Sequence, residues 1–148
     1  MKDAYRRLLA AADVRGEPRS GEWNADQILA HVSIVTATTI ATASAVAAGA
    51  PATYDNRHAQ DAWTLDRVST RAGGRAGLRE RIRRQGDALD AVSTALSAAE
   101  LDTQVPALLL SNGEVLVDRP LSLREILAGL TDVELPGHAN QLLALRTD

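Results

Sequence analysis

The sequence predicts an all-α protein: an antiparallel four-helix bundle in a single domain (residues 1–148), with a small β-hairpin before the last helix. Two observations support this prediction. Apolar residues recur every three or four positions through most of the chain, which is the period of one helix face. The apolar residues are mainly Ala, Leu and Val, and aromatic residues make up only 3%. Small side chains of this kind favour closely packed helices.

The first two predicted helices lie in the N-terminal third of the chain. Residues 3–12 repeat apolar side chains at helical spacing, with arginines on the opposite face. Asn24 is placed to cap a second helix that runs to about Ala48, where a glycine and a proline end it. Gln27, three residues after Asn24, completes a capping box.

A long connection follows over residues 51–74, and residues 61–68 predict a short helix inside it. Residues 75–99 predict the third long helix, because their leucines, isoleucine and valine form one stripe.

The pattern then changes to that of a hairpin and a last helix. Two apolar runs, residues 107–110 and 114–118, flank an Asn-Gly pair that favours a tight turn. Ser122 and Glu125 form a capping box at the start of the final helix, which extends towards Leu145. Pro136 predicts a kink or a fresh start within that helix, because proline cannot donate the helical hydrogen bond.

Composition excludes several classes of function. The chain has no cysteine, so disulfides, zinc fingers, iron–sulfur clusters and a protein thiol nucleophile are all excluded, and any thiol chemistry needs an external thiol. The lack of cysteine is also compatible with a reducing cytoplasm, which is the expected location. The formal net charge of −3 argues against a nucleic-acid partner, because such binding needs an excess of basic residues.

Residues 27–54 contain no charged side chain, and this length exceeds the roughly 20 residues needed to cross a bilayer. The segment is mostly Ala, Thr and Ser, and it contains His31. Such a composition favours a helix buried in a protein core over a membrane span. We therefore expect no membrane partner.

Two of the three histidines lie among apolar residues of predicted core helices, His31 in the second helix and His138 in the last. Glu134 stands four residues before His138, which places both on one face of a continuous helix. If the second helix faces them, two histidines and one carboxylate form a set that holds Zn(II), Fe(II) or Ni(II) with open positions. The alternative is that the histidines are structural and that Glu134 and His138 are a surface pair.

Trp23 is followed eight residues later by His31, and the last helix carries Glu134, His138 and Gln141. This arrangement resembles the DinB/YfiT-like superfamily of metal-binding four-helix bundles. That superfamily has a similar start to its second helix, and a His-x-x-x-His pair followed by x-x-Gln in its last. The glutamate in the first position is similar to the mycothiol-dependent maleylpyruvate isomerase branch, whose N-terminal bundle uses a His, Glu, His triad.

The resemblance implies a divalent metal (Zn, Ni or Fe) held by His31, Glu134 and His138, with Gln141 as a hydrogen-bond partner of a ligand. It further implies a mycothiol-type thiol that reacts with a small electrophilic substrate, in a thiol transferase or isomerase that forms a homodimer. The rival prediction is a non-catalytic bundle that binds a small apolar ligand or serves as a dimerisation module.

Two weaker signals remain. Arginines are frequent over residues 71–84, where three glycines also occur, and this run predicts either a solvated helix face or a cradle for an anion. His58 lies in a polar stretch of the long connection, where we expect it to be exposed, with a place at the mouth of a site as the alternative.

Overall fold

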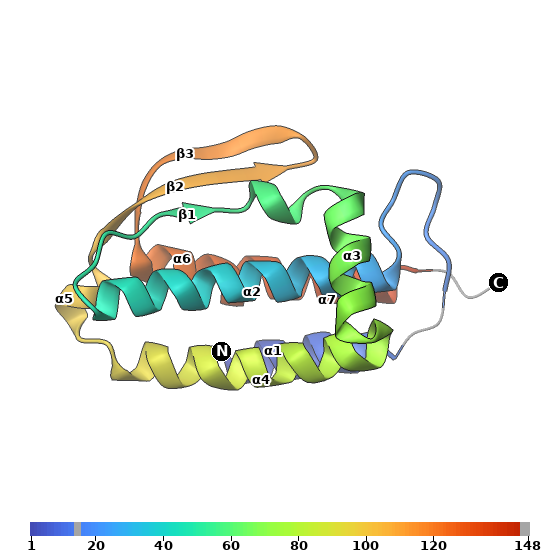
Figure 1. The fold of residues 1–148 in the computed structure, drawn as a ribbon, viewed down its shortest axis with the longest axis horizontal. Coiled ribbons are helices and arrows are strands. Elements are labelled where there is room, and N and C mark those ends of the chain that lie inside the picture. The colour runs from blue at the N-terminus through green and yellow to red at the C-terminus, as the bar shows by residue number, and fades with distance from the viewer. Residues whose placement is uncertain (14–15, 146–148) are drawn as a thin grey trace.

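The fold was analysed in a computed structural model, which describes residues 1–13 and 16–145. The protein is mostly helical and carries a small three-stranded sheet (Figure 1). The elements, in chain order, are α1 (Lys2–Ala11), α2 (Ala25–Ala47), β1 (Tyr54–Asp55), the 3₁₀ turn η1 (Arg57–Ala59), α3 (Ala62–Ala72), α4 (Gly74–Ala95), α5 (Ala98–Leu101), β2 (Gln104–Ser111), β3 (Glu114–Ser122), α6 (Leu123–Gly129), the π-helical turn η2 (Leu130–Glu134) and α7 (Leu135–Leu143).

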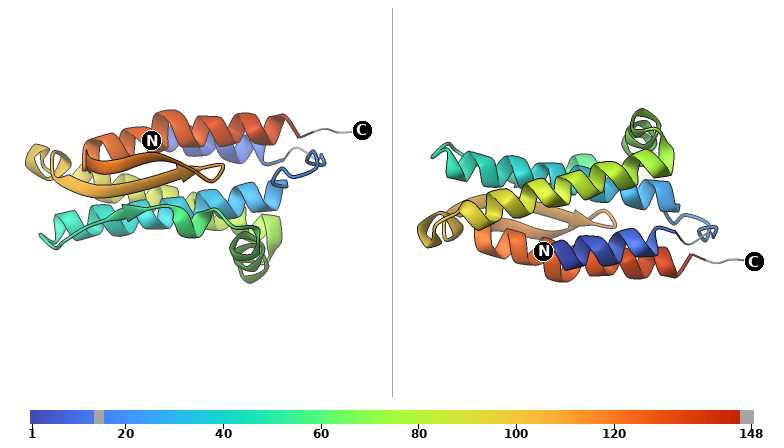
Figure 2. Two further views of the ribbon diagram at one scale, coloured as in Figure 1. Left: turned by 90° about the horizontal axis from the view of Figure 1, so that it is seen from above. Right: turned by 90° about the horizontal axis from the view of Figure 1, so that it is seen from below.

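The long helices lie alongside one another, and the sheet covers one side of them. α2 packs on α4, α1 packs on both α4 and α7, and α2 also contacts α6 and α7. Seen from above, the sheet lies over α2 and the run from α6 to α7 (Figure 2). α3 runs across the direction of α2 near one end of the assembly (Figure 1). The buried apolar side chains of these elements form one connected core.

The sheet corrects two predictions. β2 and β3 pair antiparallel around Asn112 and Gly113, whose φ angles are 51° and 80°, but β1 adds a third strand parallel to β2. The protein is therefore not all-α, and the sheet is not an isolated hairpin. β1 was not predicted because two residues carry no periodic pattern, and a parallel pairing between distant segments leaves no local signal.

The helix starts follow the predicted caps. The Asn24 side chain accepts from the Gln27 backbone in a complete capping box, and Ser122 and Glu125 form another at the start of α6. α3 is longer than the predicted short helix and begins after Asp61, whose side chain accepts from Thr64. The third predicted helix was too long, because α4 ends at Ala95 and Ser97 caps the separate α5.

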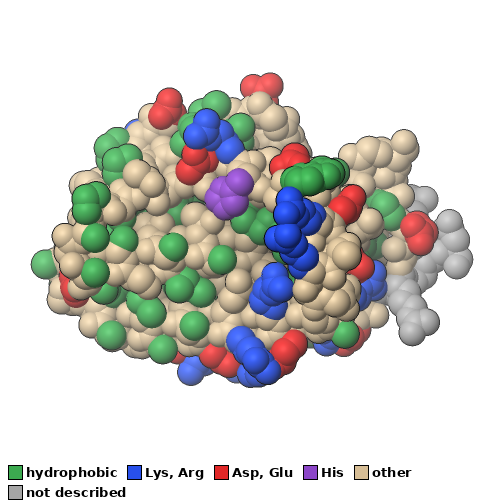
Figure 3. Space-filling view, in the orientation of Figure 1, with side chains coloured by type: hydrophobic (Ala, Val, Ile, Leu, Met, Phe, Trp, Pro, Cys, Tyr) green, Lys and Arg blue, Asp and Glu red, His purple; other side chains and the backbone are tan. Residues whose placement is uncertain are grey.

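α2 is long and apolar enough to cross a membrane by length and composition, yet 61% of its most apolar window is buried inside the protein. Its polar side chains bond to neighbouring elements. The Thr36 hydroxyl lies 3.0 Å from the Tyr5 hydroxyl, and the Thr39 hydroxyl lies 3.1 Å from the Tyr54 hydroxyl. On the face in Figure 3, which α2 crosses, hydrophobic side chains are scattered among backbone atoms and other side chains and form no continuous band. These features are typical of a core helix.

Candidate metal centre

His31 lies in the second turn of α2 and is only 3% exposed. Its Nδ1 atom lies 2.7 Å from the Ala59 carbonyl oxygen, in η1. A carbonyl oxygen can only accept, so Nδ1 carries a proton and donates it. The neutral ring therefore presents the lone pair of Nε2, and this atom lies 3.9 Å from Oε2 of Glu134.

Glu134 and His138 come from the last helical run, across a π-helical turn. The backbone N–H of Leu135 bonds to the Leu130 carbonyl, five residues earlier, in place of the usual four. The wider turn moves the backbone past Pro136, which has no N–H and whose ring would collide with the carbonyl four residues before it. The predicted interruption is thus a π-turn, and Glu134 and His138 still face each other, with Oε2 and Nε2 3.3 Å apart.

Gln141, which the resemblance implies as a hydrogen-bond partner of a ligand, lies next to His138 in the fold. Nδ1 of His138 lies 3.0 Å from Oε1 of Gln141, an oxygen that can only accept. Nδ1 of His138 is therefore protonated as well, and the neutral ring directs the lone pair of Nε2 towards Glu134. This is how outer hydrogen-bond partners commonly orient a histidine that binds a metal.

The three side chains converge on one point. One ligand atom from each of His31, Glu134 and His138 lies within 4.8 Å of the others. Metal–ligand bonds of about 2.0–2.2 Å in a tetrahedral site separate ligand atoms by about 3.4 Å. The Glu134–His138 spacing of 3.3 Å already matches this value, whereas Nε2 of His31 lies 3.9 Å from Glu134 and has to move closer to share a cation.

The same geometry explains the electrostatics of Glu134. A carboxylate that faces two imidazole nitrogens is stabilised when those nitrogens donate protons to it or when the three groups share a cation. Where Nε2 is protonated, hydrogen bonds from His138 and then from His31 lower the pKa of Glu134 to about 2, although partial burial opposes this shift. Glu134 is therefore ionised at neutral pH, as an anionic ligand must be.

His31, Glu134 and His138 line a cavity of about 770 Å³. Trp23, whose ring centroid lies 5.0 Å from that of His31, forms part of its wall. The β2–β3 tip, defined as residues 110–113, lines another side together with Asn56 and Gln60. A volume of this size holds a small molecule next to the three side chains.

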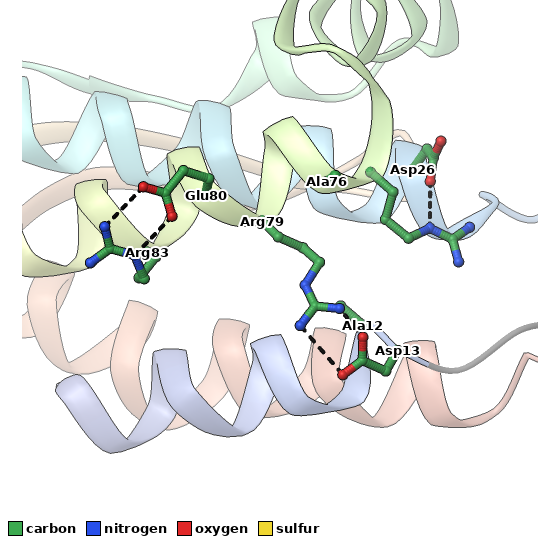
Figure 4. Close-up of a pocket in the computed structure, with 8 residues that line it drawn as sticks. Ala12, Asp13, Asp26, Ala76, Arg79, Glu80 and Arg83 are labelled. Atoms are coloured by element: carbon green, nitrogen blue, oxygen red, sulfur yellow. Dashed lines mark hydrogen bonds and ion pairs between the residues drawn. The ribbon is translucent and has the colours of Figure 1, made fainter.

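A second hollow, of about 790 Å³, lies between the end of α1, the start of α2 and α4 (Figure 4). Its charged side chains are paired with one another: Arg79 with Asp13, Arg75 with Asp26 at 2.8 Å, and Arg83 with Glu80 at 2.9 Å. Three acidic and three basic side chains line this hollow, and among the residues that the structure describes no ligand set of the kind formed by His31, Glu134 and His138 lies there. The arginine run thus forms largely an ion-paired helix face.

His58 is exposed, and its Nε2 lies 3.1 Å from the Thr38 hydroxyl, outside the described lining of the cavity. Sequence reasoning missed Asn56 and Ala59, which contact the β2–β3 tip and His31. Ala59 acts through its backbone carbonyl, for which no residue type is diagnostic. Asn56 lies in a connection without a periodic pattern, so neither gave a signal.

Comparisons of the chain with protein-family models, curated proteins and solved structures gave no match. The function is therefore proposed from the residues and geometry of the site alone.

Proposed function

We propose that this protein is a metal-dependent enzyme of DinB-like four-helix-bundle type that uses a low-molecular-weight thiol, of the mycothiol class, as its nucleophile. The reaction is a thiol transfer to a small electrophilic substrate or an isomerisation through such an adduct. The observation that supports the proposal is the convergence of two Nε2 atoms and one ionised carboxylate on a single point beside a cavity.

His31 and His138 supply neutral nitrogen ligands, and Glu134 supplies the anionic one. Two nitrogens and one oxygen suit Zn(II), Ni(II) or Fe(II), and three protein ligands leave at least one position open. A bound divalent cation supplies the positive charge that stabilises a thiolate near neutral pH. The chain has no cysteine, so the thiol must enter from solution.

The same cavity argues against the rival function, a bundle that stores a small apolar ligand. Six ionisable side chains line it, among them His31, Glu134 and His138, and Asn56, Gln60 and Gln141 add further polar groups. Its apolar side chains are Trp23, Leu110, Ala144 and Leu145. Apolar ligands favour sites lined mainly by hydrophobic side chains.

The test is a titration of the protein with Co²⁺, whose visible absorption reports the number and geometry of its ligands. We expect one ion per chain. His31→Ala and His138→Ala should each weaken binding by more than about 100-fold, because even the loss of an outer partner costs 10–100-fold. His58→Ala is the matched control, since it removes the histidine that lies outside the cavity and should leave binding unchanged. Failure of the wild-type protein to take up Co²⁺, Zn²⁺ or Ni²⁺ would contradict the proposal.

The thiol is tested separately in the Co²⁺-loaded protein with 2-mercaptoethanol as the probe. A new sulfur-to-cobalt charge-transfer band is expected, and it can arise only from the added thiol because the protein has no cysteine. Uptake of the cation without such a band would retain the metal site and reject the thiol chemistry.

A further inference from the structure

Asn56 stands at the point where β1 ends, and its side chain continues the pairing of β1 with β2. It is only 8% exposed. Its Nδ2 donates to the Leu110 carbonyl at 3.0 Å, and its Oδ1 accepts from the Leu110 N–H at 2.8 Å. The side-chain amide thus takes the place of a backbone peptide group after the chain has turned away into η1.

Leu110 begins the β2–β3 tip that lines the cavity. The register between β2 and β3 shifts between Leu109 and Leu110, so regular strand pairing is interrupted where the tip begins. Both backbone hydrogen-bonding groups of Leu110 are bound by Asn56. The hydrogen bonds of the Asn56 side chain therefore hold this part of the cavity wall in position.

The other end of the same residue leads to His31. The Asn56 carbonyl accepts from the Ala59 N–H at 3.0 Å, which closes the η1 turn. The Ala59 carbonyl in turn accepts from Nδ1 of His31 at 2.7 Å. A continuous series of hydrogen bonds therefore runs from the β2–β3 tip, through Asn56 and Ala59, to His31.

We propose that Asn56 is a positioning residue that holds the β2–β3 tip and, through the Ala59 carbonyl, the ring of His31 in one fixed arrangement. This inference rests on the proposed function in that His31 is taken to bind a cation, but the orientation itself exists without the cation. The Ala59 carbonyl cannot be removed by a side-chain substitution. Asn56 is therefore the side chain through which the arrangement can be tested.

The first measurement is nuclear magnetic resonance of the His31 ring in cation-free protein. In the wild type, the Nδ1–H proton should give a low-field signal that exchanges slowly, because it is bonded to a buried carbonyl. In Asn56→Ala, this signal should weaken or vanish. Tyr54→Phe is the matched control, because it removes the buried hydrogen bond from the same strand to Thr39 and leaves in place the bonds of Asn56 to Leu110 and of His31 to Ala59. Equal signals in Asn56→Ala and wild type, or equal losses in both variants, would overturn the proposal.

The second measurement is the affinity for Co²⁺. We expect Asn56→Ala to bind about tenfold more weakly, with an altered visible spectrum, whereas Tyr54→Phe binds like the wild type. Asn56→Asp keeps the acceptor for the Leu110 N–H and should lose less affinity; it replaces Asn56→Ala in both measurements if the alanine variant does not fold.

The two proposals fail in distinguishable ways. If the wild type binds no Co²⁺ but Asn56→Ala still loses the His31 Nδ1–H signal, the proposed metal function fails and the positioning role stands. If the wild type binds Co²⁺ and the Asn56 variants match it in signal and affinity, the positioning role fails and the metal site stands.

Discussion

Tyr5 and Tyr54 bury their rings against α2, and burial raises the pKa of each hydroxyl from 10.0 to about 12, although hydrogen bonds to Thr36 and Thr39 oppose the shift. The folded state therefore retains both protons at a pH where the unfolded chain loses them. This contribution is fully present below pH 10 and is lost as the pH rises through about 12. As the pH rises from 10 to about 12, the loss of each tyrosine's contribution should lower the free energy of unfolding by about 2 to 3 kcal/mol.

The measurement is the ultraviolet absorbance of phenolate during an alkaline titration, run beside circular dichroism. Both tyrosines of the chain should ionise together with unfolding, since Tyr5 and Tyr54 are its only two. Tyr5→Phe and Tyr54→Phe should each make unfolding less sensitive to alkaline pH. Ionisation of the native protein near pH 10, with its helices intact, would contradict this expectation.

Some residues of the site could be identified from the sequence, and others could not. His31, Glu134, His138 and Gln141 could be picked out from the sequence because few residue types bind metals and their spacing on helices is regular. Their meeting depends on how α2 and α7 pack, which spacing alone does not determine. The partners of His31 could not be predicted, because a backbone carbonyl belongs to every residue.

In the helical run from α6 through η2 to α7, a single proline is accompanied by a π-turn. Pro136 lacks an N–H, and the π-turn before it avoids the collision that an α-helical carbonyl at Asp132 would cause. We expect Pro136→Ala to remove that collision and to allow a regular α-helical turn, which rotates Glu134 relative to His138. Affinity for Co²⁺ should then fall by about tenfold while the helical content is retained.

Pro51→Ala is the control for this prediction, because it removes a proline from an exposed connection far from the π-turn in the chain. It should leave Co²⁺ binding unchanged. Pro136→Ala protein that binds Co²⁺ as tightly as the wild type would show that the π-turn does not set the position of Glu134.

The elements also show where sequence patterns suffice. α1 and α4 were predicted because apolar residues recur at helical spacing along each of them, and the starts of α2 and α6 because Asn24 and Ser122 form capping boxes there. The extent of β2 and β3 was underestimated, since Pro106 and Pro120 interrupt the apolar alternation although both pair within the ladder. β1 depends on contacts with β2 that no local pattern encodes.

At the scale of the whole molecule, the candidate site exists only when the chain is folded, because His31 and the Glu134–His138 pair lie near opposite ends of the sequence. A cation that binds them should therefore stabilise the folded state. With free Zn²⁺ at 100 times its dissociation constant, the free energy of unfolding should rise by about 2.7 kcal/mol. The unfolded chain offers no cysteine to compete for the ion, so little of this gain should be lost. Denaturant unfolding with Zn²⁺ and with a chelator measures the difference, and the Glu134→Gln variant should show almost none of it. Equal stabilisation of that variant and the wild type would mean that Zn²⁺ acts elsewhere on the protein.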